Sequence, residues 1–315
     1  LLLMTLLSAG SAVPMLAQLA SMVTDIRTIG GSGDSSPVFL GSAAATTYFT
    51  ATAPSLGREL WSTEGTPEST RLVADNCPGP CESHYTVLGG SGDRLYLARS
   101  EQPFLGTATA LLIASGNPSV LVTVVVDVDS GTLSLSGLTE TGATAMLNGD
   151  LIFSAITAPN VVELYVTDGV AGSYHLLARF ESTNGLQDLQ RAGDRVFFWN
   201  QPAGAAIELW ETDGTAGGTR QIAVPALNYP TGVSVGLDDG SLVFVASDEN
   251  GIEVWGSDGS SLGTRRISNF ADSGAKIWQM KATGNRAFFY VEDVTFGQEM
   301  WTSDGTPEGT HALTS

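Results

Sequence analysis

One short stretch of this sequence recurs at a nearly constant spacing. Its clearest copy runs from Glu208 to Arg220 and reads ELWETDGTAGGTR. Related copies, each with an aromatic residue two positions after a glutamate, begin at Glu59, Glu163, Glu253 and Glu299. The last four leading glutamates are 45, 45 and 46 residues apart, and the 104 residues from Glu59 to Glu163 leave room for a degenerate copy, LLIASG, at 111–116. A period of about 40–50 residues is typical of solenoids, propellers and repeat arrays.

Each unit predicts the same series of short strands. A strand rich in aromatic residues, such as RVFFW at 195–199, follows a turn of the Gly-Asp, Asp-Gly or Gly-Asn type, which is a strong hairpin signal. A weakly apolar strand precedes that turn, the Glu-Leu-Trp strand comes next, and a final strand such as 219–222 follows the Asp-Gly pair. No segment is long and periodic enough to predict a helix.

Four antiparallel strands per repeat are the composition of a β-propeller blade, and radial closure is how such blades avoid long unpaired edges. Six units can be counted from their aromatic strands, which lie near Tyr48, Tyr96, Phe153, Phe197, Phe244 and Phe288. We therefore predict an all-β fold, a β-propeller of four-stranded blades with six visible repeats.

The sequence leaves the number of blades at six or seven. Met22–Ile26 reads like the last strand of a unit whose other strands do not precede it. It would either close a six-bladed ring or belong to a seventh blade continued beyond Ser315, and the final strand already present at 310–313 favours the seventh blade. The segment 101–144 is the least regular, and its run at 120–126 predicts a fully apolar strand, either buried or at an edge.

Charge excludes one class of partner. The chain has 33 acidic and 14 basic residues in 315, a net charge of −19 and a pI near 4.3. Nucleic-acid binding needs clustered Lys and Arg, and the basic residues here are scattered. Acidity of this kind is typical of a soluble exported protein, and the alternative is that some carboxylates bind calcium.

The first 21 residues differ from the rest of the chain. A leucine-rich run leads into Ser, Ala and Gly, which is typical of a secretory signal peptide, although a basic region and an initial Met are missing. We expect a truncated signal-peptide-like segment at 1–21 and a propeller domain at 22–315. A buried strand or helix is the alternative, whereas Ser, Gly and Pro14 interrupt the run and disfavour a membrane anchor. The mature chain is therefore expected to have no membrane span and to be secreted or on the cell surface.

The two cysteines point to the same compartment. Cys77 and Cys81 flank Pro-Gly-Pro, which favours a turn that brings them together, so we predict a structural disulfide formed in an oxidising compartment. A metal site would need two more ligands, and a redox dithiol normally has two intervening residues.

The repeated aromatic and acidic residues have structural interpretations. We predict that the aromatic residues fill the space between adjacent blades, with a ring of carbohydrate-stacking platforms as the alternative. They are Trp61, Tyr165, Trp210, Trp255 and Trp301. The acidic residues are predicted to form tight turns with the following glycine, with calcium binding as the alternative. They are Asp168, Asp213, Asp258 and Asp304, with Glu64 in the first copy.

A basic residue follows each leading glutamate by twelve positions. These residues are Arg71, His175, Arg220, Arg265 and His311. We predict one cross-strand ion pair per blade, contributing no more than about 1 kcal/mol where it is exposed. Repetition at equivalent positions disfavours a catalytic role for either histidine.

Residues that occur once are where a specific function would be found. Asp127–Gly131 matches part of a calcium loop but lacks its later acidic ligand, and acidic loops also occur at 238–240 and 248–251. The sequence has no nucleophile elbow, phosphate loop or His-Glu-x-x-His motif. No catalytic, cofactor-binding or metal-binding residue is therefore assigned.

The Glu-Leu-Trp-x-x-Asp-Gly-Thr copies resemble those of the bacterial ELWxxDGT repeat proteins. The resemblance covers almost all of the chain after Met22, implies an exported, propeller-like bacterial protein, and carries no known activity or mapped binding site. We expect a binding or scaffold module with an unknown protein or glycan partner. The alternatives are a polysaccharide hydrolase or lyase with carboxylates in a central channel, and a structural filler in a larger adhesin.

Overall fold

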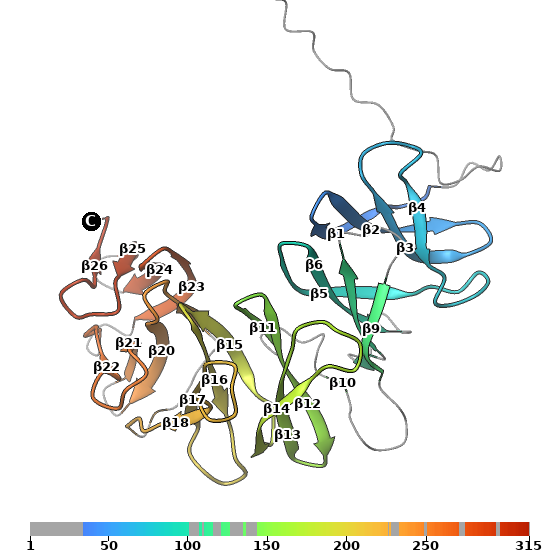
Figure 1. Ribbon diagram of the computed structural model, residues 1–315. Coiled ribbons are helices and arrows are strands. Elements are labelled where there is room, and N and C mark those ends of the chain that lie inside the picture. Colours follow the sequence, from blue (N-terminus) through green and yellow to red (C-terminus); the bar gives the residue numbers. More distant parts are fainter. Residues whose placement is uncertain are drawn as a thin grey trace, which may run out of the picture.

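A computed structural model describes residues 34–100, 107–108, 110–115, 121–126, 135–136, 144–225, 227, 233–248, 251–270, 275–293 and 297–314. In these ranges all regular structure is β-strand (Figure 1). Six four-stranded antiparallel sheets form, and each takes its strands in chain order from one repeat. The predicted all-β propeller architecture with six repeats is confirmed.

The first three sheets contain strands β1 to β14. The first sheet consists of β1 (Val38–Ala43), β2 (Thr46–Ala53), β3 (Gly57–Thr63) and β4 (Arg71–Ala74). The second consists of β5 (His84–Ser91), β6 (Arg94–Ser100), β8 (Ala110–Ser115) and β9 (Leu121–Val126). The third consists of β11 (Thr144–Leu147), β12 (Asp150–Ala158), β13 (Val161–Thr167) and β14 (His175–Glu181). A separate pair is formed by β7 (Thr107–Ala108) and β10 (Leu135–Ser136).

The last three sheets follow the same plan. The fourth consists of β15 (Gln187–Ala192), β16 (Arg195–Asn200), β17 (Glu208–Thr212) and β18 (Arg220–Ile222). The fifth consists of β19 (Ser234–Gly236), β20 (Leu242–Asp248), β21 (Gly251–Ser257) and β22 (Arg265–Arg266). The sixth consists of β23 (Lys276–Thr283), β24 (Arg286–Asp293), β25 (Gly297–Ser303) and β26 (His311–Ala312).

The irregular second unit is a complete sheet. Residues 111–115 of the degenerate LLIASG copy lie in β8, the third strand, where the strand with the leading glutamate lies in the other sheets. Residues 121–126 of the predicted apolar run form β9, the last strand at the edge of that sheet. The predicted strand at Met22–Ile26 lies outside the described residues.

The sheets follow one another along an arc (Figure 1). The first strands of successive sheets contact each other in the series β1, β5, β11, β15, β19 and β23. The first sheet and the sixth sheet lie at the two ends of the arc in Figure 1. Within the described residues no helix is long and apolar enough to cross a membrane.

The hydrophobic core is divided into five clusters, and each cluster joins two consecutive sheets. The cluster between the second and third sheets, for example, combines Tyr96 and Leu111 with Phe153 and Tyr165. The other clusters join the first and second, third and fourth, fourth and fifth, and fifth and sixth sheets. Burial of apolar surface between sheets therefore holds the arc together.

Candidate functional site

The Asp-Gly turns of the third to sixth sheets are closed by their own side chains. In the fourth sheet, Asp213 Oδ1 accepts hydrogen bonds from the Thr215 backbone N–H (2.9 Å) and from Thr215 Oγ1 (2.7 Å). Gly214 has φ +88°, which other residues rarely adopt. A Cβ on Gly218 would lie 2.0 Å from Asp213 Oδ1, so the second glycine makes room for the carboxylate.

Two hydroxyl groups complete the turn. Thr212 Oγ1 lies 2.7 Å from Thr219 Oγ1 and accepts a hydrogen bond from the Gly214 N–H (3.1 Å). The same hydroxyl pair recurs in the first, fifth and sixth sheets as Thr63–Thr70, Ser257–Thr264 and Ser303–Thr310. Sequence reasoning missed these hydroxyls, although a Thr or Ser before the acidic residue and a Thr seven positions later were visible signals in these four copies.

The turn carboxylates act as hydrogen-bond acceptors. Hydrogen bonds from Thr215 hold the pKa of Asp213 below its usual value. The pKa of Asp258 and of Asp304 is lowered chiefly by the hydroxyls of Ser260 and Thr306, and that of Asp168 chiefly by the Val170 backbone N–H. These hydrogen bonds stabilise the ionised form of each carboxylate.

The motif aromatics lie at the interfaces between sheets. Tyr165, Trp210, Trp255 and Trp301 each pack in or against the core cluster shared with the preceding sheet. Trp210 meets Phe180 of the preceding sheet edge to face at 5.0 Å. Trp61, in the first sheet, is half-buried, and no preceding sheet lies against it in the described part of the chain.

The predicted ion pairs between leading glutamates and the basic residues twelve positions later are wrong. The basic residue lies opposite the third residue after the glutamate, as Arg71 does opposite Ser62 and Arg220 opposite Glu211. His175 likewise lies opposite Val166, Arg265 opposite Gly256 and His311 opposite Thr302. Because the turn is long, the residue opposite a leading glutamate lies farther along the chain. Glu163 is opposite Arg179, and Arg179 Nη1 lies 3.5 Å from Glu163 Oε1.

Most leading glutamates instead bind the chain that leaves the sheet. The fully buried Glu253 accepts a hydrogen bond from the Phe270 backbone N–H at 2.7 Å. Glu59, also fully buried, accepts from the Asn76 N–H (3.2 Å) and from Ser83 Oγ (3.1 Å). Burial raises the pKa of Glu59, and these hydrogen bonds partly offset that effect. Glu299 accepts from Thr314, whereas Glu208 accepts from Asn200 and Trp210 of its own sheet.

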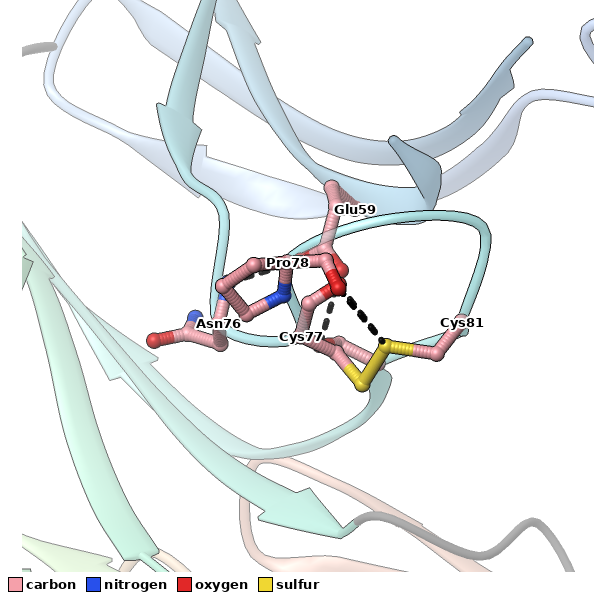
Figure 2. The surroundings of a disulfide bond; sticks show 6 residues. Glu59, Asn76, Cys77, Pro78 and Cys81 are labelled. Carbon is pink, nitrogen blue, oxygen red and sulfur yellow. Dashed lines mark hydrogen bonds between the residues drawn. A yellow bond between two sulfur atoms is a disulfide. The ribbon is translucent and has the colours of Figure 1, made fainter. Parts of the chain in front are cut away.

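The disulfide loop packs beside one of these glutamates. Cys77 and Cys81 form a disulfide with a Cα–Cα distance of 5.7 Å. Figure 2 shows the Glu59 side chain next to this loop, with Asn76 and Pro78 around it. A Cβ on Gly57 would lie 1.5 Å from the Cys81 carbonyl oxygen, so the loop lies directly on the start of β3.

Arginines at the start of alternate second strands reach the next sheet. Arg94 Nη1 donates to the Asp168 carbonyl oxygen, and Arg195 Nη1 donates to that of Asp258 at 3.2 Å. Arg195 also pairs with the buried Glu211 at 3.0 Å, and Glu211 contacts Arg220 as well. The third arginine at this position, Arg286, is exposed. Sequence reasoning missed this role, for which the recurrence of Arg was the available signal.

Of the acidic single-copy loops, the structure describes the one at 238–240 in full. Asp127–Gly131 lies outside the described residues, and Asp239 Oδ1 accepts a hydrogen bond from the Ser241 N–H at 2.9 Å in an ordinary turn. In the part of the chain that the structure describes, no group of three or more His, Cys, Asp or Glu side chains is placed to hold a metal ion.

A concavity opens at the sixth sheet and the neighbouring part of the fifth, beside the face that carries Phe288, Tyr290 and Met300, which we call the C-terminal end face. It is a cavity of about 660 Å³ lined by Val233, Ser234, Gln279, Met280, Lys281, Phe288, Phe289, Tyr290 and Met300. Phe288, Tyr290 and Met300 are half-buried, and Lys281 supplies a positive charge. This volume lies within the usual range for ligand pockets, so the cavity is the candidate binding site.

Comparisons with solved structures find low-identity matches over most of the chain. An oligogalacturonate lyase in complex with manganese matches 87% of this chain and 76% of its own, with 10% identity and a TM-score of 0.47. YCF48 bound to D1 peptide matches over 89% and 83%, with 13% identity and a TM-score of 0.45. The β-propeller domain of the trilobed protease from Pyrococcus furiosus matches over 89% and 98%, with 10% identity and a TM-score of 0.40.

These resemblances assign no activity or ligand to this chain. The chain spans about half, 54%, of the length of the puromycin hydrolase that it also matches. No protein-family model and no curated protein matches the sequence.

Proposed function

We propose that this propeller is a non-catalytic binding or scaffold module of the ELWxxDGT repeat type, exported and working at the bacterial surface or outside the cell. The observation that carries the proposal is the cavity beside the C-terminal end face. Its lining is mainly apolar and aromatic, with Lys281, Gln279 and Ser234 as its polar members. Such a lining is suited to binding a partner through buried apolar contacts with a few orienting polar groups.

The positions of the carboxylates support binding rather than polysaccharide cleavage. Glycoside hydrolysis uses two carboxyl groups placed on either side of the scissile bond. The cavity lining contains none. The repeat carboxylates, such as Asp213 and Glu253, accept hydrogen bonds from their own sheets instead.

The chemistry of the cavity favours a protein over a glycan as the partner. Side chains such as Phe288, Tyr290 and Met300 offer apolar surface, which matches an aromatic or aliphatic protein side chain better than a sugar hydroxyl. Export is supported by the signal-like composition of the first 21 residues and by the Cys77–Cys81 disulfide, which is stable in oxidising compartments.

Dye binding and a turnover assay test this proposal together. The anionic dye 1-anilinonaphthalene-8-sulfonate has an apolar body and a negative charge that Lys281 attracts. We expect its fluorescence to rise when it is mixed with the wild-type chain at low protein concentration. Met300→Asp is expected to remove most of that signal. Leu262→Asp, which changes a side chain that is 94% exposed and is not part of the lining, is expected to leave it unchanged.

The turnover assay follows reducing ends and unsaturated uronates on a panel of acidic and neutral polysaccharides, and no turnover is expected. Cleavage that a single Asp or Glu substitution abolishes, with circular dichroism unchanged, would replace the binding role with the enzymatic one.

A further inference from the structure

Each boundary between sheets buries the same three positions of the earlier sheet. Two of these positions flank the residue of the second strand that pairs with the motif aromatic position of the third strand. The third is the apolar residue directly before that motif position. In the first five sheets all of these side chains are 9% exposed or less: Tyr48, Thr50, Leu60, Tyr96, Ala98, Leu111, Ile152, Ser154, Leu164, Phe197, Trp199, Leu209, Val243, Val245 and Val254. In the sixth sheet the equivalent residues are Phe288, Tyr290 and Met300, all half-buried.

The first sheet carries the matching surface at the other end of the arc. Phe39, Phe49 and Trp61 lie opposite one another on β1, β2 and β3 and so share one face, which we call the N-terminal end face. Phe39 is 68% exposed, and Phe49 is half-buried. The residues equivalent to Phe49 in later sheets, including Phe153, Phe198 and Phe289, are at most 1% exposed because the preceding sheet covers them.

The glycines of the acidic-Gly turns show the same difference between the first sheet and the later sheets. A Cβ on Gly169 would lie 2.1 Å from Ile113 of the preceding sheet, and one on Gly259 would lie 2.3 Å from Arg195. Around Gly65, in the first sheet, nothing lies within 4 Å of such a Cβ. The turn of the first sheet is thus shaped like the others but has no sheet against it in the described part of the chain.

A repeated arginine contact also relates the sixth sheet to the first. Arg94 and Arg195 each donate to the carbonyl oxygen of the acidic residue in the next sheet's turn. Arg286 occupies the same position on the sixth sheet and is exposed. The turn that could receive it in the same way is the one at Glu64 and Gly65, where Glu64 adds a favourable charge.

We propose that the C-terminal end face binds the N-terminal end face of a second copy of this chain, so that the chains associate head to tail. This inference rests on the proposed binding role of the C-terminal end face and names its occupant. Phe49 and Trp61 of the incoming copy pack on Phe288, Tyr290 and Met300, as Phe289 and Trp301 pack on the fifth sheet. The interface joins two different faces, so it produces closed rings or open chains of copies.

Two single-face variants make a sharp test by light scattering coupled to size exclusion. The wild-type chain is expected to rise above its monomer mass of 32.8 kDa as protein concentration increases. Trp61→Asp removes one face and Tyr290→Asp removes the other, so each variant alone is expected to stay monomeric. An equimolar mixture of the two retains one intact face of each kind and is expected to form a dimer that does not grow further.

Controls address folding and charge. Leu262→Asp, which changes an exposed side chain in the turn after β21 of the fifth sheet, is expected to associate like the wild type. Arg286→Glu, which changes an exposed side chain and leaves the core intact, is expected to weaken association by about tenfold or more. Because each copy carries a net charge of −19, association is expected to strengthen in about 1 M NaCl, where the Debye length is about 3 Å.

A wild-type chain that stays at 32.8 kDa at every concentration and salt level overturns the proposal. Single variants that still associate, or a mixture of the two variants that does not associate, overturn it as well. The proposed binding role is judged separately. A monomer that binds the dye at Met300 keeps that role and removes the second copy as the occupant.

Discussion

Gly217 and Gly218 are neighbours in the fourth turn, but only Gly218 is constrained by Asp213. A Cβ on Gly218 would lie 2.0 Å from the Asp213 Oδ1 atom, whereas a Cβ on Gly217 would meet nothing within 4 Å. Neither glycine has a left-handed backbone. The spacing Asp-Gly-x-x-x-Gly therefore reflects the volume of one carboxylate.

This pair gives a matched test of the turn. Gly218→Ala is expected to lower the free energy of unfolding by about 1–3 kcal/mol because the carboxylate must leave its hydrogen bonds. Gly217→Ala is expected to be neutral or to stabilise by up to about 1 kcal/mol, since alanine restricts the unfolded chain. Urea unfolding followed by circular dichroism measures both, and equal effects would show that the carboxylate is not the constraint.

The Asp-Gly turns also predict how stability depends on pH. Hydrogen bonds lower the pKa of Asp168, Asp213, Asp258 and Asp304 in the folded chain below the value of about 3.9 that the unfolded chain retains. Their contribution is therefore fully present above about pH 4 and is lost as the pH falls through the lower, folded pKa values. Urea midpoints measured from pH 7 to pH 3 are expected to drop at the acid end.

Asp213→Asn is the control for that drop, because it keeps the Oδ1 acceptor and removes the titration. It is expected to make the acid decline shallower than in the wild type. An unchanged slope would mean that other carboxylates cause the decline.

Among the elements, the first sheet alone has a covalent crosslink beside the loop that leaves it. The Cys77–Cys81 disulfide closes a loop with a sequence separation of 4, and that loop covers Gly57 at the start of β3. The chain-entropy estimate for so short a loop is about 2 kcal/mol. Replacing both cysteines by serine is expected to lower the unfolding free energy by about that amount. Dithiothreitol should have a similar effect on the wild type and no effect on the variant.

The order of the strands could be predicted from the sequence, because each strand has its own local signal. Even the degenerate copy at 111–116 can be found from spacing alone, and its residues 111–115 lie in β8. The partners of Glu59 and Glu253 could not be predicted in the same way. They depend on the length of the turn and on register shifts such as the one between Leu60 and Trp61, which are properties of the folded hairpin.

The candidate site was hidden for a different reason. Phe288, Tyr290 and Met300 have the same residue chemistry as their buried equivalents, such as Phe197, Trp199 and Leu209. Their exposure depends on which sheet lies next to them, and no local pattern encodes that. In the described residues, no later sheet lies against the sixth one.

For the whole molecule, the turn carboxylates predict how stability responds to calcium. Because the turn carboxylates are already satisfied by Thr and Ser donors, such as Thr215 and Ser260, we expect millimolar calcium followed by EDTA to leave the melting temperature unchanged. A rise that EDTA reverses would assign a calcium site and would point first to the acidic segment at 127–131.

No four-stranded sheet in the described residues borrows a strand from another repeat. Each sheet closes its own hydrogen bonds within one stretch of chain and presents the same two faces to its neighbours. Removing or adding one whole repeat would therefore bring together faces that already fit, without rewriting any sheet. The number of repeats is thus an adjustable property of this architecture, and the reach of the arc can change in steps of one unit while every turn and interface keeps its residues.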